Sequence, residues 1–269
     1  MQDKTDINQY KQQVVADFNA RTDYDNDFRY RFANPLVELA QIQKGQHVLD
    51  VATGTGIVAI AAAQIVGTQG KVVGVDISSG MLAQAQRKVK AAGLQNVELI
   101  ETDADYLNFP DDSFDRILCS SAIAYLTNIP ASLQQWYRFT KPGGIVAFSC
   151  LAQTAITASI LFRSKAQKYG ITIPNPNEIL GTPEKCQNLL QAAGFQQIEI
   201  LTQQFGGYFT TPQHAWQANA NSAYGCQVFQ LAPDNLEQLK AEYIAEIETL
   251  ASEPEFGNDF ITFFVLAYK

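Results

Sequence analysis

Short apolar runs alternate along the chain with longer amphipathic stretches, and each run has the length of a buried strand. The amphipathic stretches carry helix signals at their ends, such as Ser78 before one helix and Gly93 and Gly194 after two others. Strands that alternate with helices imply right-handed crossovers and a parallel sheet covered on both faces. The predicted strands are 47–51, 72–75, 97–100, 114–119, 145–149, 196–201 and 260–268, and the predicted helices are 57–66, 79–93, 129–139, 183–194 and 236–250.

The pattern changes at both flanks of this alternating part. Residues 1–45 are polar and helical in character, and Pro35 is expected to open a helix that Lys44-Gly45 ends. Lys141-Pro142-Gly143-Gly144 is expected to turn the chain into the fifth strand. After residue 150 the period weakens, and residues 204–257 contain a Gly206-Gly207 pair, a Thr-Thr-Pro turn and a polar helix. No repeat and no long linker separates these parts, so one domain is expected over the whole chain.

Composition and charge narrow the class of partner. The chain has 269 residues, of which 46% are hydrophobic and 17% charged, which is typical of a globular protein. Its net charge of −8 opposes binding to a nucleic acid, since no basic stripe offsets it. A small-molecule substrate is therefore favoured, and the many aromatic side chains suit a substrate pocket.

The cysteines and histidines give little sign of a metal or of disulfides. Cys119, Cys150, Cys186 and Cys226 form no C-x-x-C pair and read as buried thiols of a reducing cytoplasm. Neither histidine belongs to a His/Asp/Glu cluster, so no metal is expected. The polar N-terminus and the lack of a membrane-length apolar run predict a cytoplasmic protein with no membrane association.

The most informative segment is the turn after the first predicted strand. Ala52-Thr53-Gly54-Thr55-Gly56 leads directly into an Ala-rich helix, and glycine lets a ligand approach the backbone closely. Asp76 ends the second strand, where nucleotide-binding units hold the ribose hydroxyls. Together these features predict a nucleotide-type cofactor at the first crossover.

The spacing of the glycines leaves the cofactor open between a dinucleotide and S-adenosylmethionine. Ala59 stands at the third glycine position of the dinucleotide pattern, which tolerates alanine. Asp50, however, lies within the first strand, where a carboxylate suits a ligand with an ammonium group better than a pyrophosphate. Asp103, after the third strand, is an acceptor at the place expected for an adenine.

These motifs in this order resemble the class I S-adenosylmethionine-dependent methyltransferases. The local sequence is similar to the small-molecule branch of quinone-biosynthesis and natural-product methyltransferases, and the likeness is best over residues 34–150. The resemblance implies an α/β, Rossmann-like fold with a mostly parallel seven-stranded sheet, ordered 3-2-1-4-5-7-6, with the last strand antiparallel. One departure is Ala52, where the family usually has glycine.

The resemblance also implies roles for individual residues. Asp76 would hold the ribose, Gly54 and Gly56 the amino-acid part, Asp103 and Ala104 the adenine, flanked by Ile77 and Met81. The predicted cofactor-binding residues are Asp50, Ala52, Thr53, Gly54, Thr55, Gly56, Asp76, Ile77, Met81, Asp103, Ala104 and Ser120. The cofactor would be S-adenosyl-L-methionine and its product S-adenosyl-L-homocysteine.

The acceptor side is less defined. Within the single domain of residues 1–269, residues 1–45 would form a helical lid, residues 46–150 the cofactor-binding core and residues 204–257 a substrate cap. Tyr125, after the fourth strand, and His214, in the cap, are the candidate catalytic residues, with His214 as a base. The candidate substrate-binding residues are Tyr24, Arg29 and Trp216.

The leading hypothesis is methyl transfer to an O, N or C nucleophile of a small metabolite by in-line displacement. An NAD(P)-dependent oxidoreductase is the alternative, but its Tyr-x-x-x-Lys spacing occurs only as Tyr137 and Lys141, at the end of a helix. A binding protein without catalytic activity is a third possibility. The acceptor, the methylated atom and the oligomeric state are not encoded in any motif of the chain.

Overall fold

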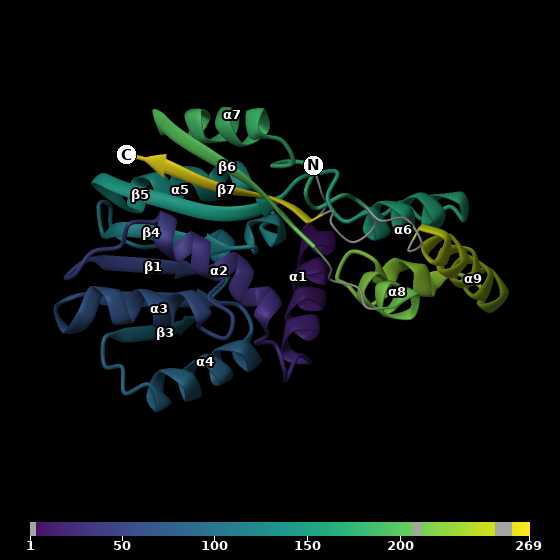
Figure 1. Ribbon diagram of the computed structural model, residues 1–269, viewed down its shortest axis with the longest axis horizontal. Helices are drawn as coiled ribbons and strands as arrows, with labels where there is room; N and C mark the ends of the chain where they lie inside the picture. The colour runs from purple at the N-terminus through teal and green to yellow at the C-terminus, as the bar shows by residue number, and fades with distance from the viewer. Residues whose placement is uncertain (1–3, 207–210, 251–259) are drawn as a thin grey trace. The chain divides into compact units, whose positions relative to one another are not determined.

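The computed structural model describes residues 4–206, 211–250 and 260–269. The contacts divide the chain into two compact units. Unit 1 comprises Met1–Cys150, Thr182–Leu201 and Phe263–Lys269, and unit 2 comprises Leu151–Gly181 and Thr202–Thr262. Three of the boundaries between the units fall within strands and the fourth falls directly before a helix (Figure 1), which explains why no linker composition marks these points.

The sheet has the predicted strand order, β3-β2-β1-β4-β5-β7-β6. Parallel pairs join β3 (Val97–Glu101), β2 (Lys71–Asp76), β1 (His47–Val51), β4 (Phe114–Ser120) and β5 (Thr140–Leu151) in that order. β7 (Phe260–Tyr268) runs antiparallel to β5: the Gly143 N–H donates to Lys269 and the Ala152 N–H donates to Ile261. β6 (Gln197–Phe205) is the outer strand. The predicted fold class is confirmed.

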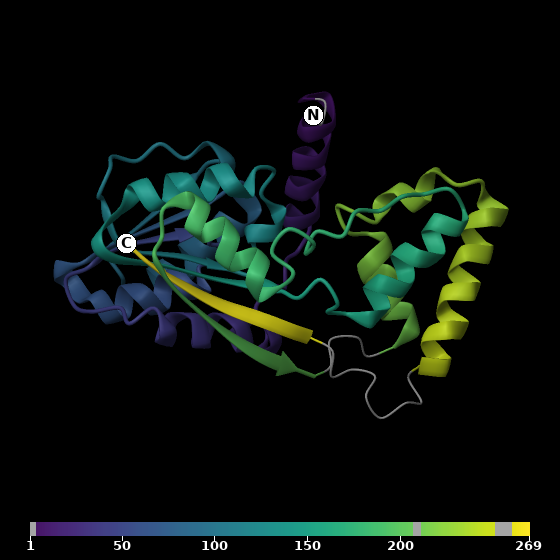
Figure 2. The ribbon, with the colours of Figure 1, turned by 90° about the horizontal axis from the view of Figure 1, so that it is seen from above.

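Helices cover both faces of this sheet (Figure 2). On one face α2 (Asp27–Leu39) packs against α3 (Ile57–Val66), and on the other α5 (Ile129–Phe139) packs against α7 (Pro183–Ala193). Side-chain caps start three helices: the predicted Ser78 for α4 (Ser79–Ala91), and Asn128 for α5 and Thr182 for α7. The remaining helix of unit 1 is α1 (Lys4–Asn19), which contacts α4.

The core of unit 1 is apolar except for a few charged side chains. Val48, Leu49 and Val51 of β1 have no exposed surface, as expected for a strand covered on both faces. The buried Arg116 donates hydrogen bonds to the carbonyls of Ala40 (2.6 Å) and Gln41 (3.2 Å), which follow α2. A cation at a helix C-terminus satisfies carbonyls that lack helical partners, so this charge is structural.

Two local predictions were wrong. α2 begins at Asp27, where the Asn26 side chain accepts a hydrogen bond from the Arg29 N–H, and Pro35 lies inside the helix. The buried face of α2 continues through Pro35, so packing outweighs the hydrogen bond that proline cannot make. Lys141–Gly144 belongs to β5 as a bulge, because Phe114 pairs with Thr140 but Arg116 pairs with Ile145.

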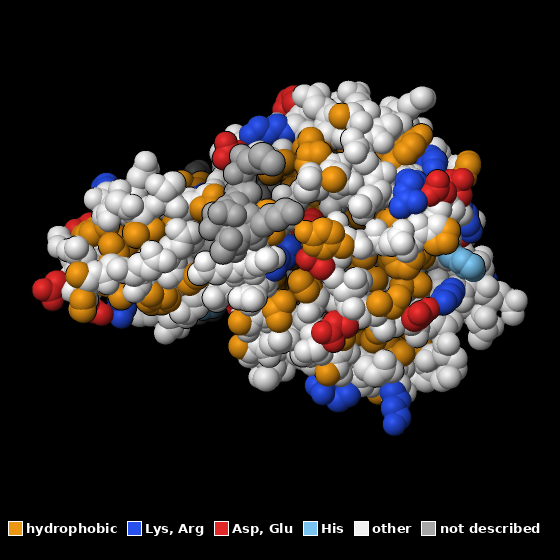
Figure 3. Space-filling model, turned by 180° about the vertical axis from the view of Figure 1, so that it is seen from behind, with side chains coloured by type: hydrophobic (Ala, Val, Ile, Leu, Met, Phe, Trp, Pro, Cys, Tyr) orange, Lys and Arg blue, Asp and Glu red, His pale blue; other side chains and the backbone are white. Residues whose placement is uncertain are grey.

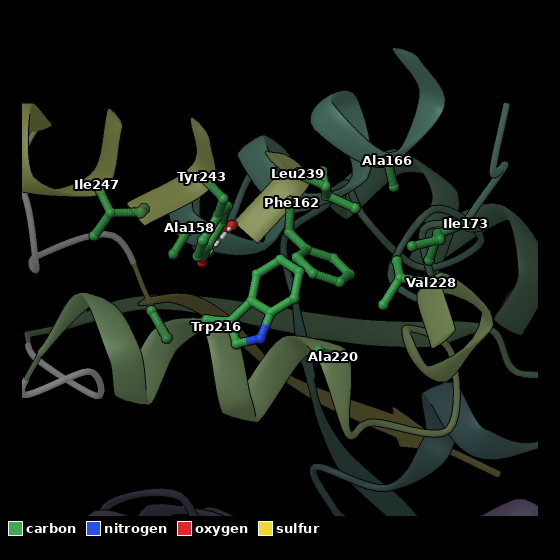
Figure 4. Close-up of a cluster of buried hydrophobic side chains, with 11 residues drawn as sticks. Ala158, Phe162, Ala166, Ile173, Trp216, Ala220, Val228, Leu239, Tyr243 and Ile247 are labelled. Atoms are coloured by element: carbon green, nitrogen blue, oxygen red, sulfur yellow. Dashed lines mark hydrogen bonds between the residues drawn. The ribbon is translucent and has the colours of Figure 1, made fainter. Parts of the chain in front are cut away.

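Unit 2 has a hydrophobic core of its own, shown in Figure 4. It is built by α6 (Thr157–Lys168), α8 (Pro212–Ala220) and α9 (Pro233–Leu250), which contact one another. The ring centroid of Phe162 lies 5.5 Å from that of Trp216 and 5.7 Å from that of Tyr243. α6 therefore packs with helices of the 204–257 segment, although it precedes that segment by many residues.

Replacing Tyr243 by phenylalanine is expected to lower the free energy of unfolding by about 1–2 kcal/mol. The buried Tyr243 hydroxyl donates to the Ala158 carbonyl at 3.2 Å (dashed in Figure 4), and the substitution leaves that carbonyl without this donor. Chemical denaturation monitored by circular dichroism measures the change. Tyr106→Phe, at a side chain that is 73% exposed, is the matched control and should leave stability unchanged.

Candidate functional site

The turn between β1 and α3 has an unusual backbone that its sequence explains. Gly54 and Gly56 have φ of +55° and +79°, in the left-handed region that glycine enters without strain. A Cβ at Gly56 would lie 3.1 Å from the Cβ of Ala85. The turn is tied to β2 because the Thr53 N–H donates to the Val75 carbonyl at 2.9 Å. The result is a turn of fixed shape at the carboxyl ends of β1 and β2.

Ala52 also has a left-handed backbone, with φ of +54°. Alanine pays about 1–2 kcal/mol for this conformation, whereas glycine does not. Ala52→Gly is therefore expected to raise the free energy of unfolding by up to about 1 kcal/mol, after the larger backbone entropy of glycine is deducted, and to raise the melting temperature slightly. Differential scanning calorimetry measures this, and a fall in stability would contradict the strain.

Asp76 is held by backbone groups on both oxygens. Oδ2 accepts the Gly54 N–H and Oδ1 accepts the Ser78 N–H, each at 2.8 Å. Burial raises the pKa of Asp76, while these N–H groups act in the opposite direction. Because a carboxylate has about four lone-pair sites, each oxygen of Asp76 can still accept a hydroxyl donor.

Asp50 is the most deeply buried acid of the site, with 1% of its surface exposed. Burial raises its pKa from 3.8 to about 7, against hydrogen bonds from the Thr53 side chain and the Ala59 backbone. The Thr53 hydroxyl donates to Asp50 Oδ2 at 2.5 Å. This carboxyl group is therefore costly to ionise unless a positive charge comes close.

The end of β3 supplies a second acidic turn. Asp103 precedes η2 (Ala104–Tyr106) and accepts the Asp105 N–H at 3.0 Å. Ala104 is buried and Ile77 is partly exposed beside Asp76. Met81 has no exposed surface and packs in the core, so its burial does not favour the predicted contact with adenine.

The end of β4 and the loop after it hold the predicted cofactor-binding residue Ser120 and the candidate catalytic residue Tyr125. Ser120, at the end of β4, is half-buried, and the Ser121 N–H after it donates to Ser149 Oγ at 2.9 Å. Tyr125 lies in η3 (Ile123–Tyr125), and its ring centroid is 5.4 Å from that of Phe18 in an edge-on arrangement. An aromatic side chain thus stands at the carboxyl end of β4.

The N-terminal segment, residues 7–29, contacts all three turns. Lys11 reaches Asp103 after β3, Asn19 Oδ1 accepts the Ser78 hydroxyl after β2 at 2.8 Å, and Asp25 accepts the hydroxyl of Thr55 after β1. Lys11, Asn19 and Asp25 were not predicted, because isolated polar residues in a polar helical segment carry no motif. Among the predicted residues, Arg29 Cζ lies 4.3 Å from the centroid of the Tyr24 ring.

The two remaining candidates belong to unit 2, and the other histidine, His47, is not a candidate. His214 and Trp216 belong to α8 of unit 2, and Trp216 packs in the core of that unit. His47 is at the start of β1, where its N–H donates to Asp115 at 2.8 Å. Within the described residues there is no group of three or more His, Cys, Asp or Glu side chains that could hold a metal ion. None of the described helices combines the length and apolar character that a bilayer span requires.

Comparison with known proteins identifies the family. Residues 29–193 match the ubiE/COQ5 methyltransferase family. The chain belongs to this family. It is 34% identical to a demethylmenaquinone methyltransferase of Geobacillus stearothermophilus over 194 residues, which are 65% of this chain and 82% of that protein. It is 41% identical over 117 residues to one of Listeria welshimeri, covering 44% of this chain and half of the relative.

Solved structures show the same fold at low identity. A SAM-dependent methyltransferase of Aquifex aeolicus is 18% identical with a TM-score of 0.54, over 91% of this chain and 94% of the other. Phosphoethanolamine N-methyltransferase 2 of Haemonchus contortus, in complex with S-adenosyl-L-methionine, is 19% identical with a TM-score of 0.58, over 98% and 57%. These likenesses support the fold of this ubiE/COQ5-family chain.

Family membership decides between the alternatives that the glycine spacing left open. The chain is an S-adenosylmethionine-dependent methyltransferase, and it transfers the methyl group to a small molecule. The hypotheses of an NAD(P)-dependent oxidoreductase and of a binding protein without catalytic activity are set aside. The roles of the individual site residues stay predictions.

Proposed function

We propose that this ubiE/COQ5-family enzyme methylates a hydroxylated aromatic acceptor of the quinol class. The observation that carries the proposal is the similarity to demethylmenaquinone methyltransferases, which extends over 82% of the Geobacillus stearothermophilus protein. An aromatic ring made electron-rich by hydroxyl groups is a nucleophile at oxygen or at carbon. Methylation of such an acceptor requires that its nucleophilic atom be aligned with the methyl group and that the acceptor lose a proton.

The geometry of the turns fits the cofactor. Glycines in the left-handed region leave the turn at Gly54 and Gly56 free of side chains. Asp76, held rigid by two backbone N–H groups, presents free lone pairs for the two ribose hydroxyls. Asp103 offers a carboxylate for the adenine amino group, and the buried Asp50 offers negative charge for the α-ammonium group, directly or through water. We assign these roles on chemical complementarity.

The chain's own part in the reaction is mainly alignment. When bound, S-adenosylmethionine supplies a methyl group on a positively charged sulfur, already activated for displacement. Side chains that fix the nucleophile in line with it contribute on the order of 7–11 kcal/mol. Water is excluded by the N-terminal segment, whose contacts with the three turns are the basis for proposing it as the lid.

The acceptor would lie by the aromatic side chains at the end of β4. The Phe18 ring centroid lies 5.4 Å from that of Tyr125 and 6.2 Å from that of Tyr24, and Arg21 Cζ is 4.5 Å from the Phe18 ring centroid. Aromatic faces suit a flat ring, and a guanidinium stabilises an ionised hydroxyl. We propose Tyr125 as the residue that contacts the acceptor, with Tyr24 and Arg29 at its side. Ser120 would lie near the methionine part.

The roles in unit 2 remain as predicted from the sequence. His214 is the candidate base, Trp216 a substrate contact and residues 204–257 a substrate cap. The burial of Trp216 in a core supports a structural role for that side chain beside the predicted one.

Surface charge supports a small-molecule acceptor over a nucleic acid. On the face seen in Figure 3, Lys and Arg side chains are scattered among Asp and Glu and form no stripe. The net charge of −8 adds a repulsive term for any polyanion. We also propose that the enzyme works in the cytoplasm, because its four cysteines are free thiols.

The test uses demethylmenaquinone reduced with dithionite and S-adenosylmethionine labelled in the methyl group. Mass spectrometry should show one labelled methyl group on the quinol, and the unreduced quinone should react far more slowly. Binding of S-adenosylhomocysteine without any methylated quinol would reject the acceptor class and leave the cofactor assignment intact.

A further inference from the structure

Lys11 of α1 bridges two acids that follow β3. Its Nζ lies 2.8 Å from Asp103 Oδ1 and 2.6 Å from Asp105 Oδ2. The side chains of Lys11, Asp103 and Asp105 are 14%, 20% and 4% exposed, so the bridge is partly shielded from solvent. Salt screens a shielded ion pair less than an exposed one, and each such pair limits the rotamers of the two side chains that form it.

The bridge occupies only one oxygen of Asp103. Oδ1 accepts both the Lys11 ammonium and the Asp105 N–H, the latter at 3.0 Å. Among the residues that the structure describes, no protein group donates a hydrogen bond to Oδ2 of Asp103. One oxygen is therefore anchored while the other keeps its full capacity to accept hydrogen bonds from a ligand.

Lys11 is itself held in a fixed place. Asp105 accepts the Thr127 N–H at 2.9 Å and the Thr127 hydroxyl at 2.6 Å, so the acid beside Lys11 is tied to the loop after β4. Burial would raise the pKa of Asp105, but the hydrogen bonds from Lys11 and Thr127 hold it below its ordinary value. The neighbouring Tyr10 hydroxyl donates to the Tyr125 carbonyl at 3.3 Å, which docks the same helix turn.

We propose that Lys11 is a positioning residue for adenine recognition, which holds Asp103 so that its Oδ2 accepts the adenine amino group. The inference rests on the assignment of Asp103 to the adenine in the proposed function. Through Lys11, α1 contributes to the enzyme's specificity for the cofactor and does not only cover the site. A carboxylate oxygen favours an amino group and disfavours the carbonyl oxygen of hypoxanthine, so an oriented Asp103 discriminates between the two bases.

The experiment compares two ligands by isothermal titration calorimetry: S-adenosylhomocysteine and S-inosylhomocysteine, in which hypoxanthine replaces adenine. The wild-type protein should prefer the adenosyl compound. Lys11→Met should weaken the adenosyl compound about 10-fold and change the inosyl compound little, so that the affinity ratio shrinks. Lys11→Arg, which keeps the charge, should restore most of the ratio. Should Lys11→Met fail to fold, Lys11→Gln has the same expected effect.

Two further variants separate the possible failures. Lys71→Met removes an exposed ion pair with Glu98 at the start of β2 and should leave both affinities unchanged. Asp103→Asn should shrink the ratio as Lys11→Met does. If it does not, the adenine assignment fails, and this inference fails with it. If Asp103→Asn shrinks the ratio but Lys11→Met weakens both ligands equally or neither, the inference alone is overturned.

Discussion

Replacing Asp76 by alanine should weaken the binding of S-adenosylhomocysteine about 100-fold, which corresponds to about 2.7 kcal/mol. The substitution removes the proposed acceptor of two ribose hydroxyls, and hydrogen bonds to a charged group contribute about 1.5–3 kcal/mol each. It also leaves the N–H groups of Gly54 and Ser78 without the carboxylate that now accepts them.

Calorimetric titration of the variant with S-adenosylhomocysteine measures the effect. Asp115→Ala is the matched control, because Asp115 also accepts a backbone N–H, that of His47, and lies at the amino end of the strands. It is expected to lower stability through the loss of its pairing with Lys141 and to leave ligand affinity unchanged. Wild-type affinity in Asp76→Ala would remove this residue from the cofactor site.

Asp50→Asn should stabilise the ligand-free protein above neutral pH and weaken its binding of S-adenosylhomocysteine. Burial raises the pKa of Asp50 from 3.8 to about 7 in the folded protein. The folded state then binds the proton more tightly than the unfolded state, so wild-type stability falls as the pH rises from about 4 to 7. At about 1.4 kcal/mol per unit, the cost reaches a few kcal/mol, ~4 at most, above pH 7. Asparagine keeps the acceptor for the Thr53 hydroxyl and avoids this cost.

Melting temperatures at pH 5 and pH 8, with and without the ligand, give both parts of the result. The gain from Asp50→Asn should be larger at pH 8, and the ligand should stabilise the variant less than the wild type. Asp112→Asn, at an exposed acid paired with Lys269, should show no gain at pH 8. Equal melting of Asp50→Asn and wild type at both pH values would contradict the cost of burying this charge.

The sequence predicted those features that local patterns encode. β1, α3, α5 and β7 are found within a residue of their expected bounds, because apolar runs, caps and the Gly/Thr turn are contiguous signals. The strand order came from the resemblance to a family. Pro35 shows the limit of a local rule, since the buried face of α2 outweighs the missing hydrogen bond.

The site residues that were not predicted make contacts between segments that are far apart in the sequence. Lys11 pairs with Asp103 across 92 positions of sequence, and Asn19 bonds to Ser78 across 59. Most lysine and asparagine residues in a polar helical segment are exposed to solvent. Only the folded structure shows which few of them contact an acid or a free N–H group. The turns after β1, β2 and β3 could be predicted because the fold family repeats them, whereas the segment that contacts them could not.

The central claim is that the turns after β1, β2 and β3 hold S-adenosylmethionine through Asp50, Asp76 and Asp103. A crystal structure of the complex with S-adenosylhomocysteine tests it most directly. The account predicts both ribose hydroxyls within hydrogen-bond distance of Asp76, and the adenine amino group on Asp103. A ligand bound away from these turns, or with its ribose turned from Asp76, would contradict it.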